Sequence, residues 1–224
     1  MFKNIRDDLD AYKTRDPAAR SKLEIFLLYS GFHAVFWYRI AHWFLKHRCH
    51  FIARLISQLT KFFTGIEIHP GAEIGRGLVI DHGTGVVIGE TTVIGDDCTI
   101  YQGVTLGGTG KDCGKRHPTL GDRVMIGSGA KVLGPFKVGD DSKVASNAVL
   151  LSELPPNSTA VGVPARIVRR NGKKVCSDLD QVHIPDPVAQ ELCKMSICVR
   201  KLEKRIATLE AEIDCQKQST SLNK

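Results

Sequence analysis

With 224 residues, the chain accommodates one large domain or one domain with appendages, and a hydrophobic fraction of 42% is enough to build a core. The formal net charge of +7 favours an anionic ligand, but the basic residues are scattered and form no recognisable nucleic-acid-binding module, so nucleic acid is not expected as a partner. The seven cysteines are odd in number and include no C-x-x-C pair, which indicates neither a disulfide framework nor a zinc ribbon and makes a cytoplasmic protein the expectation.

Residues 1–64 are predicted to form a helical domain, because apolar residues recur there at helical spacing. Acidic residues near the start are untypical of a signal peptide, and the longest uncharged apolar stretch, residues 25–38, is shorter than the about 20 residues that span a bilayer, so no membrane association is expected. Asp16 and Pro17 resemble a helix start with Asp16 as N-cap, and Gly31 marks a bend or a close contact. The side chains expected on inward faces are Leu23, Phe26, Leu27, Phe36, Ile40 and Phe44.

Between residues 65 and 170 an aliphatic side chain recurs every six positions, and seven of thirteen such residues are followed directly by glycine. Neither a helix of 3.6 residues per turn nor a strand of period two explains this spacing. A hexapeptide repeat does: each unit makes one short strand and one corner, and three units complete a coil of a β-helix with the aliphatic side chains stacked inside. The periodic residues are Ile68, Ile74, Ile80, Ile88, Ile94, Ile100, Leu106, Leu120, Ile126, Val132, Val138, Val144 and Leu150.

The repeat is interrupted twice, and each interruption contains a histidine. The spacing from Ile80 to Ile88 is eight residues and includes His82, whereas the spacing from Leu106 to Leu120 is fourteen and includes His117. Repeat proteins confine insertions to loops, often on the binding face. Neutral imidazole is the usual general base near pH 7, so these two histidines are the candidate bases that would activate a hydroxyl or amine nucleophile.

The C-terminal part is predicted to comprise a linker, residues 171–187, and an amphipathic helix with a polar tail, residues 188–224. The helix shows apolar residues at alternating spacings of four and three, which is typical of a coiled-coil seam. Two interpretations stay open: the helix packs on its own domain, or it forms a coiled coil between subunits. The seam consists of Val188, Leu192, Met195, Val199, Leu202, Ile206, Leu209 and Ile213.

Six segments in this order resemble the serine acetyltransferase family in its shorter bacterial form, over residues 7–170. They read RDPA, GFHAVFWYRIAHW, IHPGAEIGRGLVIDHGTGVVIGE, VTLGGTGK, GKRHPTLGDRVMIGSGAKVLG and AVGVPARIV. The resemblance implies an α+β protein in which an N-terminal α-helical bundle is followed by a left-handed parallel β-helix. It also implies a homotrimer or a dimer of trimers, with sites between neighbouring subunits. The heptad helix lies outside the resemblance.

The activity implied by the resemblance is acetyl transfer from acetyl-CoA, as co-substrate, to the hydroxyl of L-serine in cysteine biosynthesis, without a metal or prosthetic group. His82 would be the general base, Glu67 the carboxylate that orients it, and His117 would contact the substrate and share acid–base work. Asp16 and Asp81 would bind the serine amino group and Arg116 its carboxylate, and Glu90 also falls in the family pattern. For acetyl-CoA, the residues implied are Gly108, Thr109, Ser128, Gly129, Lys131, Ser146 and Arg166.

Further expectations follow from the same resemblance. L-cysteine differs from serine by one atom and is expected to act as a feedback inhibitor. In the family, a C-terminal peptide ending in isoleucine docks into O-acetylserine sulfhydrylase. Because this chain ends in Lys224, that docking is not expected.

Three alternatives stay open on the residues alone. The first is a hexapeptide-repeat acetyltransferase acting on a sugar or an antibiotic, which would need the histidine base but not the charged set that fits an amino acid. The second is a zinc-dependent hydration enzyme, for which His69, His82 and His117 are the candidate ligands. The third is a scaffold without catalytic activity.

Overall fold

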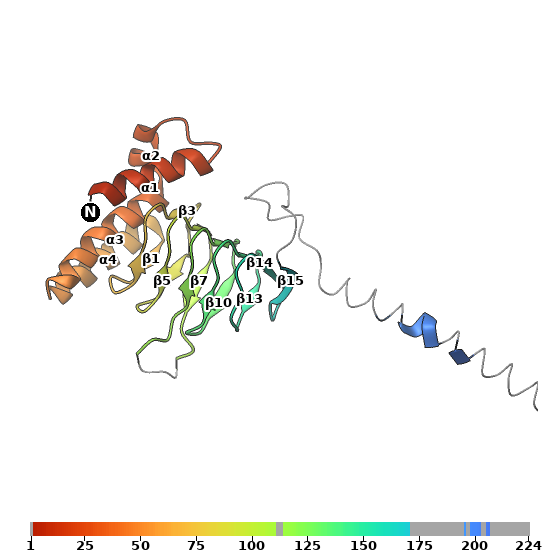
Figure 1. The fold of residues 1–224 in the computed structure, drawn as a ribbon. Coiled ribbons are helices and arrows are strands. Elements are labelled where there is room, and N and C mark those ends of the chain that lie inside the picture. Colours follow the sequence, from red (N-terminus) through yellow and green to blue (C-terminus); the bar gives the residue numbers. More distant parts are fainter. Residues whose placement is uncertain (1, 111–113, 171–194, 196–197, 203–204, 207–224) are drawn as a thin grey trace, which may run out of the picture. The chain divides into compact units, whose positions relative to one another are not determined.

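The computed structural model describes residues 2–110, 114–170, 195, 198–202 and 205–206. Four helices come first in the chain (Figure 1). None of the helices in the described ranges is long and apolar enough to cross a membrane. The helices are α1 (Phe2–Arg15), α2 (Lys22–Leu28), α3 (Ser30–Lys46) and α4 (His50–Thr64).

The predicted helix start at Asp16 is wrong. Helix α1 ends at Arg15, and the Asp16 carboxylate accepts a hydrogen bond from the backbone N–H of Ala18 at 2.8 Å, which closes a turn after the helix. The true N-cap of α2 is Ser21, whose hydroxyl accepts from the N–H of Glu24 at 3.1 Å. Ser21 and Glu24 match the Ser-x-x-Glu pattern of a capping box, except that the Glu24 carboxylate accepts from the N–H of Arg20 at 3.2 Å, and the cap lies five residues later than predicted.

Half of the predicted inward faces of the helical domain are also wrong. Leu23, Phe26 and Leu27 are 67%, 46% and 57% exposed, because α2 has only seven residues and buries only Ile25. The prediction for Gly31 is confirmed as a close contact. A Cβ at this position would lie 2.0 Å from the backbone oxygen of Ile80, so glycine allows α3 to approach the first coil of the β-helix.

Strands β1 to β14 wind into a left-handed parallel β-helix, as predicted, with one strand per coil in each of three sheets. Sheet A has the order β1-β4-β7-β10-β13, sheet B β11-β8-β5-β2, and sheet C β15-β14-β12-β9-β6-β3. The strands are β1 (Glu67–Ile68), β2 (Glu73–Ile74), β3 (Val79–Asp81), β4 (Val87–Ile88), β5 (Val93–Ile94), β6 (Thr99–Tyr101), β7 (Thr105–Gly107), β8 (Thr119–Leu120), β9 (Met125–Ile126), β10 (Lys131–Leu133), β11 (Lys137–Val138), β12 (Lys143–Val144), β13 (Val149–Leu150), β14 (Ser158–Val161) and the antiparallel β15 (Arg166–Arg170).

The repeat defines the core. Of the thirteen periodic aliphatic residues, Ile74 alone is half-buried and the others are buried. They stack in register from coil to coil, for example Ile68 on Ile88 and Ile88 on Leu106 in sheet A. Each stacked side chain removes apolar surface from water, and this burial stabilises the fold by about 25 cal/mol per Å². The coils are therefore stable although most of their strands have only two or three residues.

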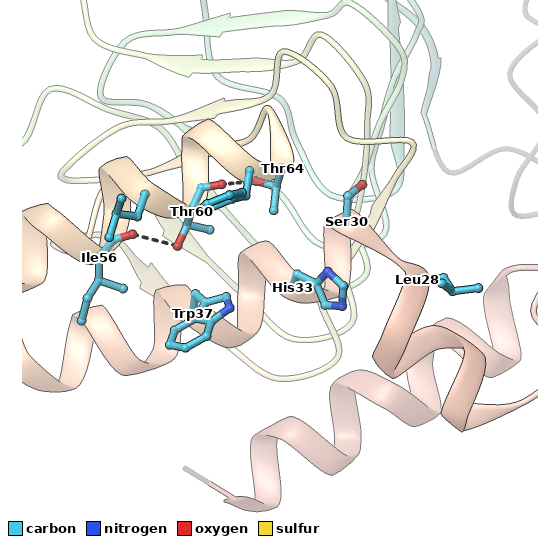
Figure 2. Close-up of a pocket in the computed structure, with 9 residues that line it drawn as sticks. Leu28, Ser30, His33, Trp37, Ile56, Thr60 and Thr64 are labelled. Carbon is cyan, nitrogen blue, oxygen red and sulfur yellow. Dashed lines mark hydrogen bonds between the residues drawn. The ribbon is translucent and has the colours of Figure 1, made fainter.

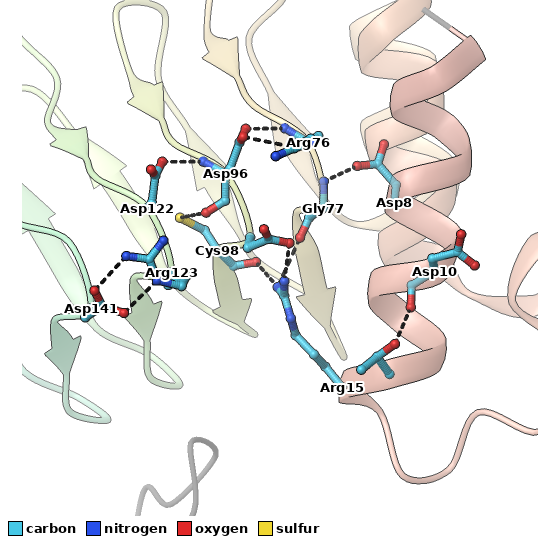
Figure 3. Close-up of polar contacts among 12 residues, drawn as sticks. Asp8, Asp10, Arg15, Arg76, Gly77, Asp96, Cys98, Asp122, Arg123 and Asp141 are labelled. Atoms are coloured by element: carbon cyan, nitrogen blue, oxygen red, sulfur yellow. Dashed lines mark hydrogen bonds and ion pairs between the residues drawn. The ribbon is translucent and has the colours of Figure 1, made fainter. Parts of the chain in front are cut away.

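The corner between sheets B and C carries a polar ladder (Figure 3). The carboxylates of Asp96, Asp122 and Asp140 each accept a hydrogen bond from a backbone N–H one coil earlier, at 2.8 to 3.1 Å. Glycine precedes each aspartate, and a Cβ at Gly95 would lie 2.4 Å from a carboxylate oxygen of Asp122. The Gly-Asp steps therefore cap successive corners, and this corner holds none of the predicted site residues.

The helices cover the first coil of the β-helix and satisfy its open edge. The Tyr12 hydroxyl donates to the carbonyl of Ile80 at 3.0 Å and accepts from its N–H at 2.9 Å, as a neighbouring strand would. Hydroxyls of Tyr38 and Ser57 donate to carbonyls of the same coil at 2.6 and 2.8 Å. An unpaired strand edge invites aggregation, and the helical domain removes that edge.

Helix α4 ends at Thr64, and β1, the first strand of the β-helix, begins at Glu67. Helices and β-helix form one compact unit, residues 1–184. The predicted linker, residues 171–187, lies outside the described residues. Of the predicted heptad helix, the described apolar residues Met195, Val199, Leu202 and Ile206 are helical and exposed, and the remainder of residues 188–224 lies outside the description.

Candidate active site

The two interruptions of the repeat lie at different corners of the triangular β-helix. His82 lies between β3 of sheet C and β4 of sheet A. His117 lies two residues before β8 of sheet B, at the end of the loop that follows β7 of sheet A. We call these the C/A corner and the A/B corner. Both border sheet A, but a single chain presents the two imidazoles at separate edges of that sheet.

His82 projects from the C/A corner into solvent. Its backbone has a φ of 58°, a left-handed conformation that other corner residues of this β-helix share, such as Asp97 and Asn147. The side chain is 77% exposed, and its Nε2 lies 3.9 Å from a carboxylate oxygen of Asp81. The inserted residues therefore turn an imidazole out of the repeat and keep a carboxylate beside it.

Asp16 and Asp81 lie near each other beside a tyrosine that sequence reasoning missed. Burial, a hydrogen bond to Asp16 and the negative charges of Asp16, Glu24 and Asp81 together raise the pKa of Tyr29 to about 12. Burial chiefly raises the pKa of Tyr12, against the hydrogen bond with Ile80, which lowers it, and the charges of Asp8, Asp81 and Asp16 raise it further. The turn after α1 thus brings Asp16 to the side of the β-helix where Asp81 and His82 begin their corner.

Glu67 contacts a lysine rather than His82 in the structure. Its Oε2 lies 2.5 Å from Nζ of Lys61 on α4, and no hydrogen bond or ion pair joins it to His82 within the described part of the chain. Glu67 is the first residue of β1 in sheet A and lies in register with Val87 of β4, the strand that follows His82. Among the described residues, the carboxylate paired with His82 belongs to Asp81.

His117 is held firmly at the A/B corner. It is only 8% exposed, and its Nδ1 lies 3.2 Å from the backbone N and 2.9 Å from the hydroxyl of Thr91. The ring lies against Gly89, where a Cβ would be 2.0 Å from its Cδ2. Burial lowers the pKa of His117, and the positive charge of Arg116 lowers it further, so the ring is neutral near pH 7.

Arg116 and Glu90 form an ion pair next to His117. The hydrogen bond from Arg116 holds the pKa of Glu90 below its ordinary value. His69 belongs to the same corner: a Cβ on Gly71 would lie 3.1 Å from His69 Nδ1 and 3.2 Å from Glu90 Cγ. Burial first, and the charge of Arg54 second, lower the pKa of His69. The A/B corner therefore gathers two neutral imidazoles around an arginine–glutamate pair.

The residues implied in acetyl-CoA binding divide between the corners. Ser128, Gly129 and Ser146 lie at the C/A corner, on the same edge as His82, in coils that follow it. The ammonium of Lys131, on β10 of sheet A, donates to the carbonyl of Gly103 at this corner. Together they form a continuous strip that starts at His82 and runs along the β-helix away from the helical domain.

Gly108 and Thr109 lie at the A/B corner, directly after β7. A Cβ at Gly108 would lie 3.0 Å from the backbone oxygen of Arg116, so glycine permits the loop to fold back on itself there. Arg166 begins β15 at the far end of the β-helix, beyond the last coil. The residues implied in acetyl-CoA binding thus lie in three separate places of one chain: the C/A corner, the A/B corner and strand β15.

An apolar cleft of about 560 Å³ opens between α2, α3 and α4 (Figure 2). The hydroxyls of Thr60 and Thr64 donate hydrogen bonds to backbone carbonyls of their own helix, those of Ile56 and Thr60, so both hydroxyls already have partners. None of the predicted site residues lines this cleft, which consists of Leu28, Ser30, His33, Trp37, Ile56, Leu59, Thr60, Phe63 and Thr64.

The described residues contain no group of three or more His, Cys, Asp or Glu side chains placed to hold a metal ion. His69 and His82, two of the three candidate zinc ligands, border opposite edges of sheet A. A zinc site made of His69, His82 and His117 is therefore not formed within one chain.

Comparison with known proteins identifies the family. Residues 1–36 match the family model described as "Serine acetyltransferase, N-terminal", and residues 117–152 match "Bacterial transferase hexapeptide (six repeats)". A serine acetyltransferase of Bacillus subtilis is 52% identical over 218 residues, which are 97% of either chain. The chain belongs to the serine acetyltransferase family.

Solved structures of the family share this fold. A serine acetyltransferase of Neisseria gonorrhoeae in complex with serine is 41% identical, with a TM-score of 0.73 over 75% of this chain and 69% of the other. One of Brucella abortus in complex with coenzyme A is 43% identical, with a TM-score of 0.75 over 77% and 69%. One in complex with cysteine is 43% identical, with a TM-score of 0.78 over 81% and 71%.

Proposed function

We propose that this protein is a serine O-acetyltransferase that transfers the acetyl group of acetyl-CoA to the hydroxyl of L-serine, as a step toward cysteine. Membership of the family at 52% identity over nearly the whole chain carries this proposal. The two histidine-bearing corners support it, since they supply an exposed imidazole and charged groups of both signs for an amino-acid substrate.

The reaction proceeds by direct attack. The imidazole of His82 takes the proton of the serine hydroxyl while the oxygen attacks the thioester carbonyl carbon. The tetrahedral intermediate then collapses, the carbon–sulfur bond breaks, and the proton passes from His82 to the departing thiolate of coenzyme A. Asp16 and Asp81 bind the ammonium group of serine, and Arg116, held by Glu90, binds its carboxylate as a bidentate pair.

The complete site forms between chains in a homotrimer. The C/A corner of one chain supplies Asp81 and His82, and the A/B corner of its neighbour supplies Arg116 and His117. One chain keeps these corners apart, so a second copy is needed to surround a molecule as small as serine. In a closed three-fold ring, every chain contributes its C/A corner to one site and its A/B corner to the next, so all three sites are complete.

Acetyl-CoA lies along the β-helix between the same two chains. The strip of Ser128, Gly129, Lys131 and Ser146 begins at His82 and leads toward Arg166, whose charge suits the phosphates of the nucleotide end. Gly108 and Thr109 of the neighbouring chain lie beside Arg116 and flank the pantetheine arm. The thioester is then placed between the two corners, and no metal takes part.

Glu67 orients His82 once the substrates are bound. In the described structure its carboxylate is neutralised by Lys61 of α4, which is 48% exposed and on a flexible stem. During the reaction, Glu67 would leave Lys61 and pair with the imidazolium of His82. The carboxylate would then stabilise the positive charge, as a carboxylate does behind a catalytic histidine.

L-cysteine acts as a feedback inhibitor by occupying the serine pocket. It offers the same ammonium and carboxylate groups to Asp16, Asp81 and Arg116, and a solved family member has been obtained with cysteine. Inhibition should therefore be competitive with serine.

Two trimers pair through the helical domain. Helix α4 exposes large apolar side chains, among them Phe51, Leu55, Phe62 and Phe63 at 79%, 47%, 81% and 79% exposure, and Phe63 also lines the cleft. Contiguous apolar surface of this kind marks a protein contact.

The described cysteines Cys49, Cys98 and Cys198 are free thiols, which fits a protein of the reducing cytoplasm.

The test is release of coenzyme A by the full-length protein with L-serine, glucosamine, a galactoside or chloramphenicol as acceptor. We expect turnover with serine alone, and loss of about 10²-fold or more in His82→Ala. Turnover with a sugar or chloramphenicol but not with serine would replace this function by the alternative, a hexapeptide-repeat acetyltransferase of another acceptor.

A further inference from the structure

The hydroxyl of Thr91 makes three hydrogen bonds, and together they determine in which of them it is the donor. Its hydroxyl oxygen accepts from the backbone N–H of Arg116 at 3.0 Å and of His117 at 3.1 Å. A hydroxyl has two acceptor lone pairs and one proton. Because both lone pairs are used, the proton of the hydroxyl must be donated in its third contact, which is to Nδ1 of His117 at 2.9 Å.

The backbone N–H of Thr91 also points at Nδ1 of His117, with a donor–acceptor distance of 3.2 Å. A backbone amide can only donate. Two donors therefore converge on one ring nitrogen, and that nitrogen carries no proton. In the neutral imidazole the single ring proton must then be on Nε2.

The ring is also kept neutral and in place. Burial and Arg116 lower the pKa of His117, so protonation of Nδ1 against two donors is disfavoured. Gly89 lies under the ring and allows the close approach. Within the described residues no hydrogen bond to Nε2 of His117 is formed, which leaves its N–H available to a ligand.

We propose that His117 works as a neutral hydrogen-bond donor through Nε2–H rather than as a proton acceptor, and that Thr91 is the positioning residue that fixes this tautomer. Its partner is the thioester oxygen as it gains negative charge, because Gly108 and Thr109, which flank the thioester arm, are in the same loop as His117. This rests on the proposed function. It divides the two histidines by role: His82 moves the proton, and His117 stabilises the oxyanion.

The tautomer is tested without any turnover, by long-range proton–nitrogen correlation NMR of the histidine side chains in the full-length protein. His117→Gln identifies the His117 signals by their disappearance. We expect the Nδ1 signal of an unprotonated nitrogen and the Nε2 signal of a protonated one near pH 7. A protonated Nδ1 would overturn the proposal. Because no substrate is used, this result does not depend on whether serine is the acceptor.

Kinetics test the role. A glutamine amide can donate a hydrogen bond but cannot take up a proton, so His117→Gln should keep about tenfold more kcat than His117→Ala, itself lowered by about 10²-fold. The acidic limb of the rate–pH profile should be the same in His117→Gln as in the wild type. Equal loss in the two variants, loss of that limb, or an effect confined to the KM for serine would each contradict the donor role.

Thr91 has its own matched pair of variants. Thr91→Ser keeps the hydroxyl and should retain wild-type kcat within about threefold, whereas Thr91→Val removes it and should lower kcat about tenfold with little change in the KM for acetyl-CoA. Thr91→Val should also broaden or shift the Nδ1 signal of His117. An unchanged signal together with wild-type kcat in Thr91→Val would show that the hydroxyl does not position the ring.

Discussion

A single missing Cβ at Gly89 determines whether the imidazole of His117 can lie where it does. The nearest ring atoms, Cδ2 and Nε2, are 2.0 and 2.1 Å from the position that a Cβ would occupy. The ring cannot easily move aside, because Thr91 holds it through hydrogen bonds to Nδ1. Gly89 is thus part of the site although it carries no functional group.

Gly89→Ala should lower kcat by about 10²-fold, since a displacement of about 1 Å of a positioned group has this effect. The strand β4 ends one residue earlier, so the coil itself should persist. Circular dichroism and the size of the assembly serve as controls for folding. Wild-type turnover in a folded Gly89→Ala protein would show that the position of the His117 ring does not matter.

At the scale of elements, helix α1 acts as a substitute strand for the exposed edge of β3. The buried Tyr12 hydroxyl satisfies both the N–H and the carbonyl of Ile80, which lies two residues before His82. Arg39 of α3 and Asp8 of α1 add a buried ion pair whose atoms are 2.7 Å apart. The helical domain therefore supports the C/A corner directly, in addition to contributing Asp16.

Tyr12→Phe should lower the free energy of unfolding by about 2 kcal/mol, because two buried backbone groups lose their partner. Thr14→Ala, on the same helix but in an exposed contact with the carbonyl of Asp10, is the matched control and should change it by less than about 0.5 kcal/mol. Chemical denaturation measures both values. Equal and small effects would mean that Tyr12 does not seal the edge.

The elements that sequence could predict are those set by the repeat. The thirteen periodic residues fixed the sheets, the coil length and both interruptions, because an aliphatic side chain that must face inward every six residues leaves few alternatives. The helix boundaries near Asp16 were missed because an aspartate after a helix and an aspartate before one look alike until the Ser21–Glu24 capping pair is weighed.

The candidate site was predicted less fully, for physical reasons that differ from residue to residue. His82 and His117 stand out as breaks in a pattern. The roles of Thr91, Gly89 and Tyr29 depend on contacts between segments far apart in the sequence, such as Thr91 with His117, 26 residues later, and no local pattern encodes them. The contact of Glu67 with Lys61 likewise depends on how α4 packs on β1.

For the molecule as a whole, two neutral imidazoles, the half-buried His69 and the buried His117, make stability depend on pH. The pKa values of His69 and His117 lie below the ordinary 6.5, chiefly because both rings are shielded from water. In the unfolded chain they take up protons near pH 6.5, so between that pH and the lowered pKa values the unfolded state binds more protons. The free energy of unfolding should be insensitive to these groups above pH 7 and fall as the pH drops below about 6.5.

Denaturant titrations at intervals between pH 5 and pH 8 measure this slope. A protein carrying both His69→Gln and His117→Gln should lose less stability on acidification than the wild type, whatever its stability at pH 8. An identical slope in the two proteins would show that other groups cause the acid sensitivity.

The central claim concerns the assembly: the C/A corner of one chain and the A/B corner of another together make the site. Co-expression of His82→Ala and His117→Ala chains tests it most directly. Every mixed trimer contains one junction with both histidines intact, so random mixing should restore about one quarter of wild-type activity, far above either variant alone. If the mixed preparation is no more active than the two variants assayed separately, the site lies within one chain and the account is wrong.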